Sequence, residues 1–168
     1  MAGSPRGAFR SAGRAARRLL PADGDLDHFV AIIAAHRRRA IKVRACDLSP
    51  DDPSGLWVPL PDEDLVLHAR RITPEHRTVV VCHELAHMLL GHQSQAGESD
   101  ISIILVALDI SIHPAVAARF FTRHGYQASE EAEAEELATQ ISTGLGRRAT
   151  AHAALEVLAK DNISMRLR

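Results

Sequence analysis

The segment that most constrains the fold begins at Thr73 and carries both the start and the stop signals of a helix. Thr73 supplies a hydroxyl that can cap the first turn, Pro74 suits the first helical position, and Glu75 adds an acid there. Apolar residues then recur at helical spacing, and Gly91 ends the pattern, as glycine commonly does at helix C-termini. The sequence therefore predicts a capped helix with an apolar face.

This helix contains the motif HExxH at residues 83–87. Residues four apart lie on one face of a helix, so His83 and His87 can bind a single Zn²⁺ ion through neutral imidazole nitrogens. Glu84 is rotated away from the ion but is near enough to take a proton from water. The motif predicts a metal site with a general base. The alternative is a helix with two partly buried histidines and an exposed glutamate.

An open zinc site needs a third protein ligand, and His92 is the nearest candidate. The extended motif HExxHxxGxxH does not fit, because Gly91 follows His87 by four residues rather than three and His92 follows by five rather than six. We therefore interpret Gly91 and His92 as the end of the helix and its neighbour.

The other candidate ligands lie in an acidic segment, residues 130–136, which holds half of the chain's glutamates. Ser129 can cap a helix there, and acids at a helix start can be purely solvated. Glu131 borders the apolar face and is one turn from Glu135, so one could bind metal while the other supports a histidine ligand. Glu133 borders the opposite side of that face and is the alternative ligand.

The length of the chain predicts one main domain, and a resemblance to a known family of proteins, carried by residues 83–92 and 131–138, places it at about residues 25–145. A helix over residues 25–39 is expected to end in a solvated run of arginines. Three short strands follow, and Pro59 moves the second toward a sheet edge. Residues 101–112 fit either a buried strand or a buried helix. The strands are expected at 40–45, 56–60 and 65–69, and further helices at 114–123 and 130–143.

The two ends of the chain are expected to lie outside this domain. Residues 1–24 contain several arginines but no hydrophobic run or cleavage site, so a disordered basic leader is favoured over a transit peptide or twin-arginine signal. Gly144 and Gly146 are expected to end the glutamate helix. Residues 146–168 would then form a C-terminal helix and tail.

Composition narrows the classes of function further. Hydrophobic residues form 46% of the chain, and the net charge of −1 gives no general attraction to nucleic acid or to an anionic membrane. The longest apolar stretch is too short to span a bilayer. Cys46 and Cys82 form no CxxC pair, which favours a reduced, cytoplasmic setting without a disulfide framework. Cys82 and Trp57 are both expected to be packing residues.

Two blocks, HELAHMLLGH at residues 83–92 and EAEAEELA at residues 131–138, resemble the ImmA/IrrE family of metallo-endopeptidases, which belongs to the gluzincin group. Looser similarity upstream, including residues 55–57, resembles the actinobacterial branch of that family. Matched by position, the glutamate that binds zinc in gluzincins of the ExxxD type falls on Glu131. The Asn/Asp position falls on Glu135, which departs from the family pattern.

The resemblance implies an α+β fold of the minimal zincin, or gluzincin-like, kind. A helix and a small antiparallel sheet would pack on the HExxH helix and on a second, glutamate-bearing helix. The strand over residues 64–69 is expected to be an edge to which an extended peptide adds. Tyr126 and His124 lie where gluzincin-like enzymes often keep a group that stabilises the oxyanion. Tyr126 is the catalytic candidate, with simple packing as the alternative.

The resemblance also implies a function: hydrolysis of peptide bonds with one Zn²⁺ ion held by His83, His87 and Glu131. The substrate would be a regulatory protein, typically a helix-turn-helix repressor that binds DNA, cleaved to control transcription in mobile elements or stress responses. Two other classes stay open. One is a non-catalytic zinc-binding regulator, and the other is the toxin or interaction component of a two-gene module. The sequence does not determine the oligomeric state.

Overall fold

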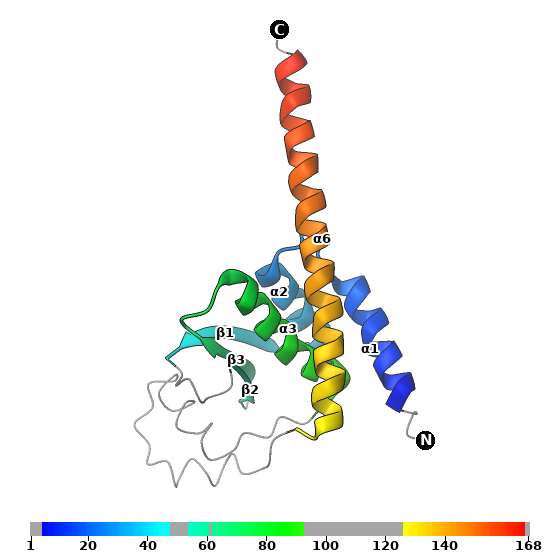
Figure 1. Ribbon diagram of the computed structural model, residues 1–168, viewed down its shortest axis with the longest axis vertical. Helices are drawn as coiled ribbons and strands as arrows, with labels where there is room; N and C mark the ends of the chain where they lie inside the picture. The colour runs from blue at the N-terminus through cyan, green and yellow to red at the C-terminus, as the bar shows by residue number, and fades with distance from the viewer. Residues whose placement is uncertain (1–4, 48–53, 61, 93–125, 167–168) are drawn as a thin grey trace.

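The computed structural model describes residues 5–47, 54–60, 62–92 and 126–166, which form an α+β arrangement (Figure 1). The expectations for residues 101–112, 114–123 and His124 lie outside these residues. The described part contains four helices and three strands: α1 Pro5–Leu19, α2 Leu26–Arg37, β1 Ala40–Cys46, β2 Gly55–Pro59, β3 Glu63–Ala69, α3 Pro74–Leu90 and α6 Ala128–Arg166.

The three strands form a mixed sheet in the order β1-β3-β2. β2 and β3 are antiparallel, with Trp57 opposite Val66, as expected for strands joined by a short turn. β1 and β3 are parallel, with Lys42 opposite Leu65, so the expectation of an antiparallel sheet is wrong for this pair. β3 returns from the hairpin into the position between β1 and β2, and its direction there matches that of β1.

β3 is therefore the central strand, and the expectation that residues 64–69 form an open edge is wrong. Its residues from Asp64 to His68 are all buried, whereas β1 alternates between exposed and partly buried positions. Among the strands of the described residues, β1 and β2 form the edges of the sheet. The prediction that Pro59 lies on an edge strand is confirmed, since an edge strand tolerates the missing backbone N–H of proline.

α3 begins and ends as its sequence predicts. The hydroxyl of Thr73 accepts a hydrogen bond from the backbone N–H of His76 at 3.2 Å, and Pro74 occupies the first turn. Gly91 has φ of 76°, the left-handed conformation that glycine adopts easily at a helix end. Val81 and Leu85 are fully buried and belong to the same hydrophobic core as Ile141 of α6.

The expectation of a disordered leader is wrong for residues 5–19, which form α1. Ala12 and Ala16 are 6% and 2% exposed and belong to the hydrophobic core, with Phe9 packed against it. Arg17 also donates a hydrogen bond to the side chain of Gln140 on α6, at 3.1 Å. Composition overstated the solvation of this segment because the arginines occupy one face of a helix and the alanines the other.

α6 continues without a break through Gly144 and Gly146, so the expected helix end there is wrong. Gly144 instead permits close packing: a Cβ at this position would lie 2.6 Å from Cδ1 of Leu20. Gly24, with φ of 71°, likewise approaches the backbone of α6, where a Cβ would meet the carbonyl oxygen of Leu145 at 2.3 Å. Beyond these contacts the C-terminal part of α6 projects away from the other elements (Figure 1).

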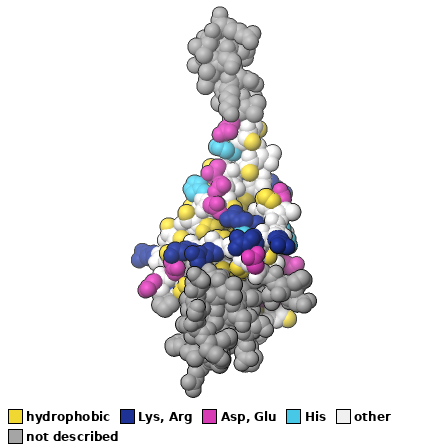
Figure 2. All heavy atoms as spheres, turned by 90° about the vertical axis from the view of Figure 1, so that its left-hand side faces the viewer, with side chains coloured by type: hydrophobic (Ala, Val, Ile, Leu, Met, Phe, Trp, Pro, Cys, Tyr) yellow, Lys and Arg dark blue, Asp and Glu magenta, His cyan; other side chains and the backbone are white. Residues whose placement is uncertain are grey.

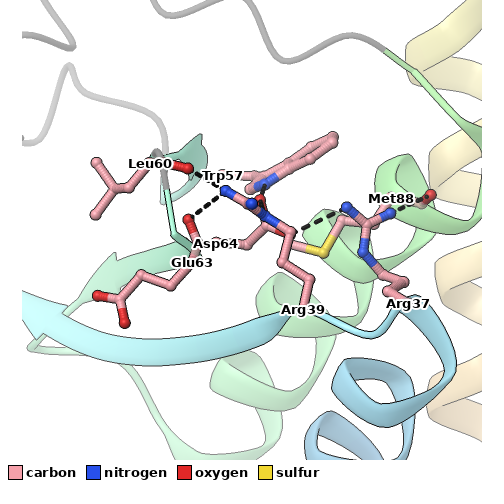
Figure 3. A network of polar contacts seen from close by, with 7 residues as sticks. All are labelled: Arg37, Arg39, Trp57, Leu60, Glu63, Asp64 and Met88. Atoms are coloured by element: carbon pink, nitrogen blue, oxygen red, sulfur yellow. Dashed lines mark hydrogen bonds and ion pairs between the residues drawn. The ribbon is translucent and has the colours of Figure 1, made fainter.

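Two arginines at the end of α2, Arg37 and Arg39, are not solvated as expected, whereas Arg38 is exposed. Asp64, only 1% exposed, forms ion pairs with Arg37 at 3.0 Å and Arg39 at 3.1 Å, and accepts a hydrogen bond from Nε1 of Trp57 at 3.0 Å (Figure 3). Arg37 also donates to the carbonyl oxygen of Met88, near the end of α3, at 3.0 Å. This network ties α2, the β2–β3 hairpin and α3 together.

Basic side chains gather in a band across one face of the molecule, with acidic side chains among them (Figure 2). Opposite charges pair elsewhere as well, as in Lys42 with Glu63 at 2.7 Å and Arg70 with Asp47 at 3.2 Å. Within the described ranges, no helix combines the length and the apolar character that crossing a bilayer requires.

Candidate metal centre

Three predicted ligands come together where α3 and α6 pack against each other. Nε2 of His83 lies 3.0 Å from Nε2 of His87 and 3.2 Å from a carboxylate oxygen of Glu131. The other carboxylate oxygen of Glu131 lies 3.8 Å from Nε2 of His87. One ligand atom from each residue fits within a set whose members are at most 4.8 Å apart, so the group could hold a metal ion.

These separations suit a small tetrahedral ion. With bonds of about 2.0–2.1 Å, ligand atoms around zinc lie roughly 3.3 Å apart. The separations between these donors, 3.0, 3.2 and 3.8 Å, lie around that value, with the two carboxylate oxygens of Glu131 facing different histidines. Two imidazoles and one carboxylate also form a ligand set found in catalytic zinc sites, where a fourth position stays open. The donors of His83, His87 and Glu131 therefore fit one zinc ion.

The ligands differ in their exposure. The side chain of His87 is fully buried, and burial together with the charges of His83 and His92 lowers its pKa to about 3. His87 is therefore neutral at physiological pH, as a metal ligand must be. The side chains of His83 and Glu131 are 27% and 46% exposed, so one side of the group faces solvent.

Glu84 is buried, at 6% exposure, which disagrees with the alternative of a structural helix that exposes this residue. Burial, and to a smaller extent the charge of Glu131, raise the pKa of Glu84 to about 8, although a hydrogen bond with the backbone of Trp57 opposes the change. A carboxyl group whose pKa lies near neutrality can both accept and release a proton in that range.

Strand β2 lies directly against Glu84. A Cβ on Gly55 would come within 3.0 Å of Oε1 of Glu84 and within 2.4 Å of Cγ1 of Val80 on the preceding turn of α3. Glycine at position 55 therefore permits the close approach between the edge strand and the helix. No signal in the sequence alone identified this role.

Two glutamates of the acidic helix contact different histidines. Glu131 contacts His83 and His87, as described above, whereas Oε2 of Glu133 lies 3.7 Å from Nε2 of His92. Glu133 is therefore outside the candidate ligand group. Glu135, the residue expected to support a histidine from one turn further along, is exposed.

His92 is the residue that the spacing argument set aside, and it lies in the site without being one of the three ligands. Its side chain is buried, and its Nδ1 lies 2.9 Å from Nδ1 of His87. The sequence signal for this position is the glycine directly before His92. A left-handed turn at Gly91 brings the side chain of His92 back toward the preceding turn of the helix.

Tyr126 packs against the ring of His87. The rings of Tyr126 and His87 are stacked, with centroids 3.6 Å apart and planes inclined by 16°. This contact matches the packing role that the sequence left open, and the oxyanion role stays a prediction. Cys82 is fully buried and its pKa is raised to about 12 by burial, so the prediction of a core packing residue is confirmed.

No protein-family model, curated protein or solved structure matches this chain.

Proposed function

We propose that this chain is a zinc-dependent metallo-endopeptidase, with His83, His87 and Glu131 holding one zinc ion and Glu84 acting as general base. The observation that carries the proposal is the convergence of three suitable donors beside a buried glutamate with a raised pKa. An isolated metal group would support storage or structure equally well. The adjoining proton acceptor favours hydrolysis.

A bound zinc ion would supply Lewis-acid polarisation of the peptide carbonyl and would lower the pKa of water at the open position. Glu84 accepts a proton from the attacking water and delivers it to the nitrogen of the leaving amine. Both transfers are feasible because its pKa lies close to neutral pH, at about 8 before a neighbouring cation lowers it. The partly exposed side of the group, at His83 and Glu131, provides access for the substrate.

The edge of β2 is the favoured place for an extended peptide. β2 is an edge strand, and the backbone of Trp57 hydrogen-bonds to Glu84, so this edge lies beside the proposed base. A peptide added here as a further strand would bring its own backbone next to the site. This replaces β3, which the sequence favoured and which lies in the centre of the sheet.

The proposed substrate class rests on the sequence resemblance to ImmA/IrrE peptidases. It is a cytoplasmic DNA-binding transcriptional regulator whose cleavage alters transcription, as in a stress response. The chain itself would contact this protein and neither nucleic acid nor a membrane.

Glu84→Gln tests the proposal, because it keeps the size of the side chain while removing its proton affinity. Wild-type and variant proteins loaded with zinc would be incubated with a peptide library of mixed sequence, and the products identified by mass spectrometry. We expect cleavage by the wild type only, with one zinc bound in both proteins. Equal cleavage by both would contradict the role of Glu84. A zinc-bound wild type without any peptidase activity would favour the non-catalytic regulator or the two-gene interaction component.

A further inference from the structure

His92 is held against His87 by two separate contacts. Its backbone N–H donates a hydrogen bond to the carbonyl oxygen of His87 at 3.0 Å, within the turn formed at Gly91. Its ring nitrogen Nδ1 lies 2.9 Å from Nδ1 of His87, and both rings are buried. The two rings are inclined at 64°, with centroids 5.0 Å apart. The edge of one imidazole therefore meets the edge of the other.

A nitrogen–nitrogen contact of this length requires one proton between the two rings. If His87 carries the proton on Nδ1, it donates to His92 and leaves a lone pair on Nε2, the nitrogen that faces Glu131 and His83. If His92 carries the proton on Nδ1, neutral His87 must carry its own proton on Nε2, where it blocks metal binding. The state of His92 therefore decides whether His87 can be a ligand.

Glu133 selects between these two states. Its carboxylate lies 3.7 Å from Nε2 of His92, an ion-pair distance at which its negative charge attracts a proton on that nitrogen. With the proton on Nε2, Nδ1 of His92 is left as an acceptor for His87. α6 thus presents Glu131 to the ligand face of His87 and Glu133 to the far side of His92.

We propose that His92, oriented by Glu133, is a positioning residue that fixes His87 in the tautomer and orientation needed for metal binding. The inference rests on the proposed metal site but not on peptidase activity. Ligating histidines commonly hydrogen-bond through the second ring nitrogen, and loss of such a contact typically weakens metal binding 10- to 100-fold. Here the contact comes from a second histidine just beyond the end of the same helix.

Zinc affinity measured by competition with a chromophoric chelator tests the proposal. We expect His92→Phe, which keeps a ring but removes the acceptor, to weaken zinc binding about 10- to 100-fold. His92→Gln should recover part of that loss, because its amide oxygen can accept a hydrogen bond. Glu133→Gln should fall between the wild type and His92→Phe. Glu135→Gln, an exposed neighbour on the same helix, is the matched control and should bind zinc as the wild type does.

A second measurement uses the metal-free protein and separates positioning from a general loss of structure. Imidazole ¹H–¹⁵N correlation spectra report which nitrogen of His87 carries the proton. We expect the Nδ1–H tautomer in the wild type and in Glu135→Gln, and the Nε2–H tautomer in His92→Phe.

Wild-type affinity in His92→Phe, together with an unchanged His87 tautomer, would overturn the inference while leaving the metal site intact. If Glu133→Gln alone bound zinc with wild-type affinity, His92 would keep its positioning role and Glu133 would have no part in it. Absence of zinc binding by the wild type would instead overturn the metal site itself.

Discussion

Glu131 and Glu133 are two residues apart on α6, yet they serve different histidines. Glu131 contacts the ring nitrogens of His83 and His87 that face each other, whereas Glu133 contacts His92. Helical rotation separates the two carboxylates by about 200° around the axis, and side-chain length brings both back toward α3. Glu131 is therefore a proposed metal ligand, whereas Glu133, two positions later, acts through His92.

Replacing each of these glutamates with alanine tests the assignment at the residue scale. Glu131→Ala removes one of three proposed ligands. After gel filtration this variant should therefore retain much less zinc than the wild type does. Glu133→Ala should keep close to one zinc per chain, because it changes only a contact outside the ligand group. Total-metal analysis of the two variants gives the answer. If Glu133→Ala lost its zinc and Glu131→Ala kept it, the third ligand would be Glu133 and not Glu131.

Asp64 gives a second prediction at the residue scale, on stability. Asp64→Asn keeps the shape of the side chain but leaves Arg37 and Arg39, both mostly buried, without their counter-charge. Breaking a buried ion pair from one side costs about 3–5 kcal/mol, and urea unfolding should show a loss of about 3 kcal/mol. Asp47→Asn is the control: its pair with Arg70 is exposed on both sides and should contribute under about 1 kcal/mol. Equal losses would show that the network does not hold the elements together.

At the scale of elements, the site depends on how closely α6 approaches its neighbours. Gly144 faces Leu20, the first residue after α1, and Gly24 lies against the backbone of α6 at Leu145. These contacts hold the middle of α6, the helix that carries Glu131. Glycine inside a helix normally costs stability, and here close packing at Gly144 offsets that cost.

The two glycines of α6 should respond differently to alanine. A Cβ at Gly146 meets no atom within 4 Å, so Gly146→Ala should raise the free energy of unfolding by about 0.5–1 kcal/mol through helix propensity. A Cβ at Gly144 would lie 2.6 Å from Leu20 and requires that side chain to move, so Gly144→Ala should be less stable than Gly146→Ala by about 1–2 kcal/mol. Identical unfolding curves for the two variants would contradict the close packing.

At the scale of the whole molecule, α1 packs with α3 and α6 around one hydrophobic core. The arginines that suggested a disordered leader lie on the exposed side, while Ala12 and Ala16 face inward. The helix that carries Glu131 is thus supported by α3 on one side and by α1 on another (Figure 1). The position of the metal site depends on the beginning of the chain as well as on its two motif blocks.

A charge placed on the buried side of α1 tests this docking. Ala16→Asp buries a carboxylate at a position that is 2% exposed, which should lower the free energy of unfolding by at least about 2 kcal/mol. Ser11→Asp adds the same charge at an exposed position of the same helix and should change stability by less than about 0.5 kcal/mol. Thermal unfolding of both variants distinguishes them. Equal melting temperatures would mean that α1 does not dock.

Local signals predicted α3 almost to the residue, because Thr73, Pro74 and Gly91 determine its ends through contacts within one turn. The facing histidines also followed from helix geometry alone. The third ligand needed contact between two elements distant in sequence, and periodicity could only narrow it to neighbouring glutamates. Resemblance to known peptidases then pointed to Glu131, which is the glutamate that lies beside the histidines.

Features that depend on distant contacts were predicted poorly. Gly144 has the local signature of a helix end, yet α6 continues through it, and the residue instead gives room for the side chain of Leu20. The parallel pairing of β1 with β3 depends on where the hairpin inserts, which no local pattern specifies. Arg37 and Arg39 lie at the end of α2, where solvent is the usual partner, yet they pair with the buried Asp64. Tertiary packing decided each of these cases.

The most direct test of the central claim is the zinc X-ray absorption spectrum of the purified protein, together with its metal content. The proposed site predicts one zinc per chain, coordinated by two imidazole nitrogens and by oxygen donors. The histidine signal should weaken in His83→Ala and persist in the exposed control His36→Ala. A wild-type protein that binds no stoichiometric zinc, or a spectrum unchanged by His83→Ala, would contradict the metal site and the peptidase proposal that depends on it.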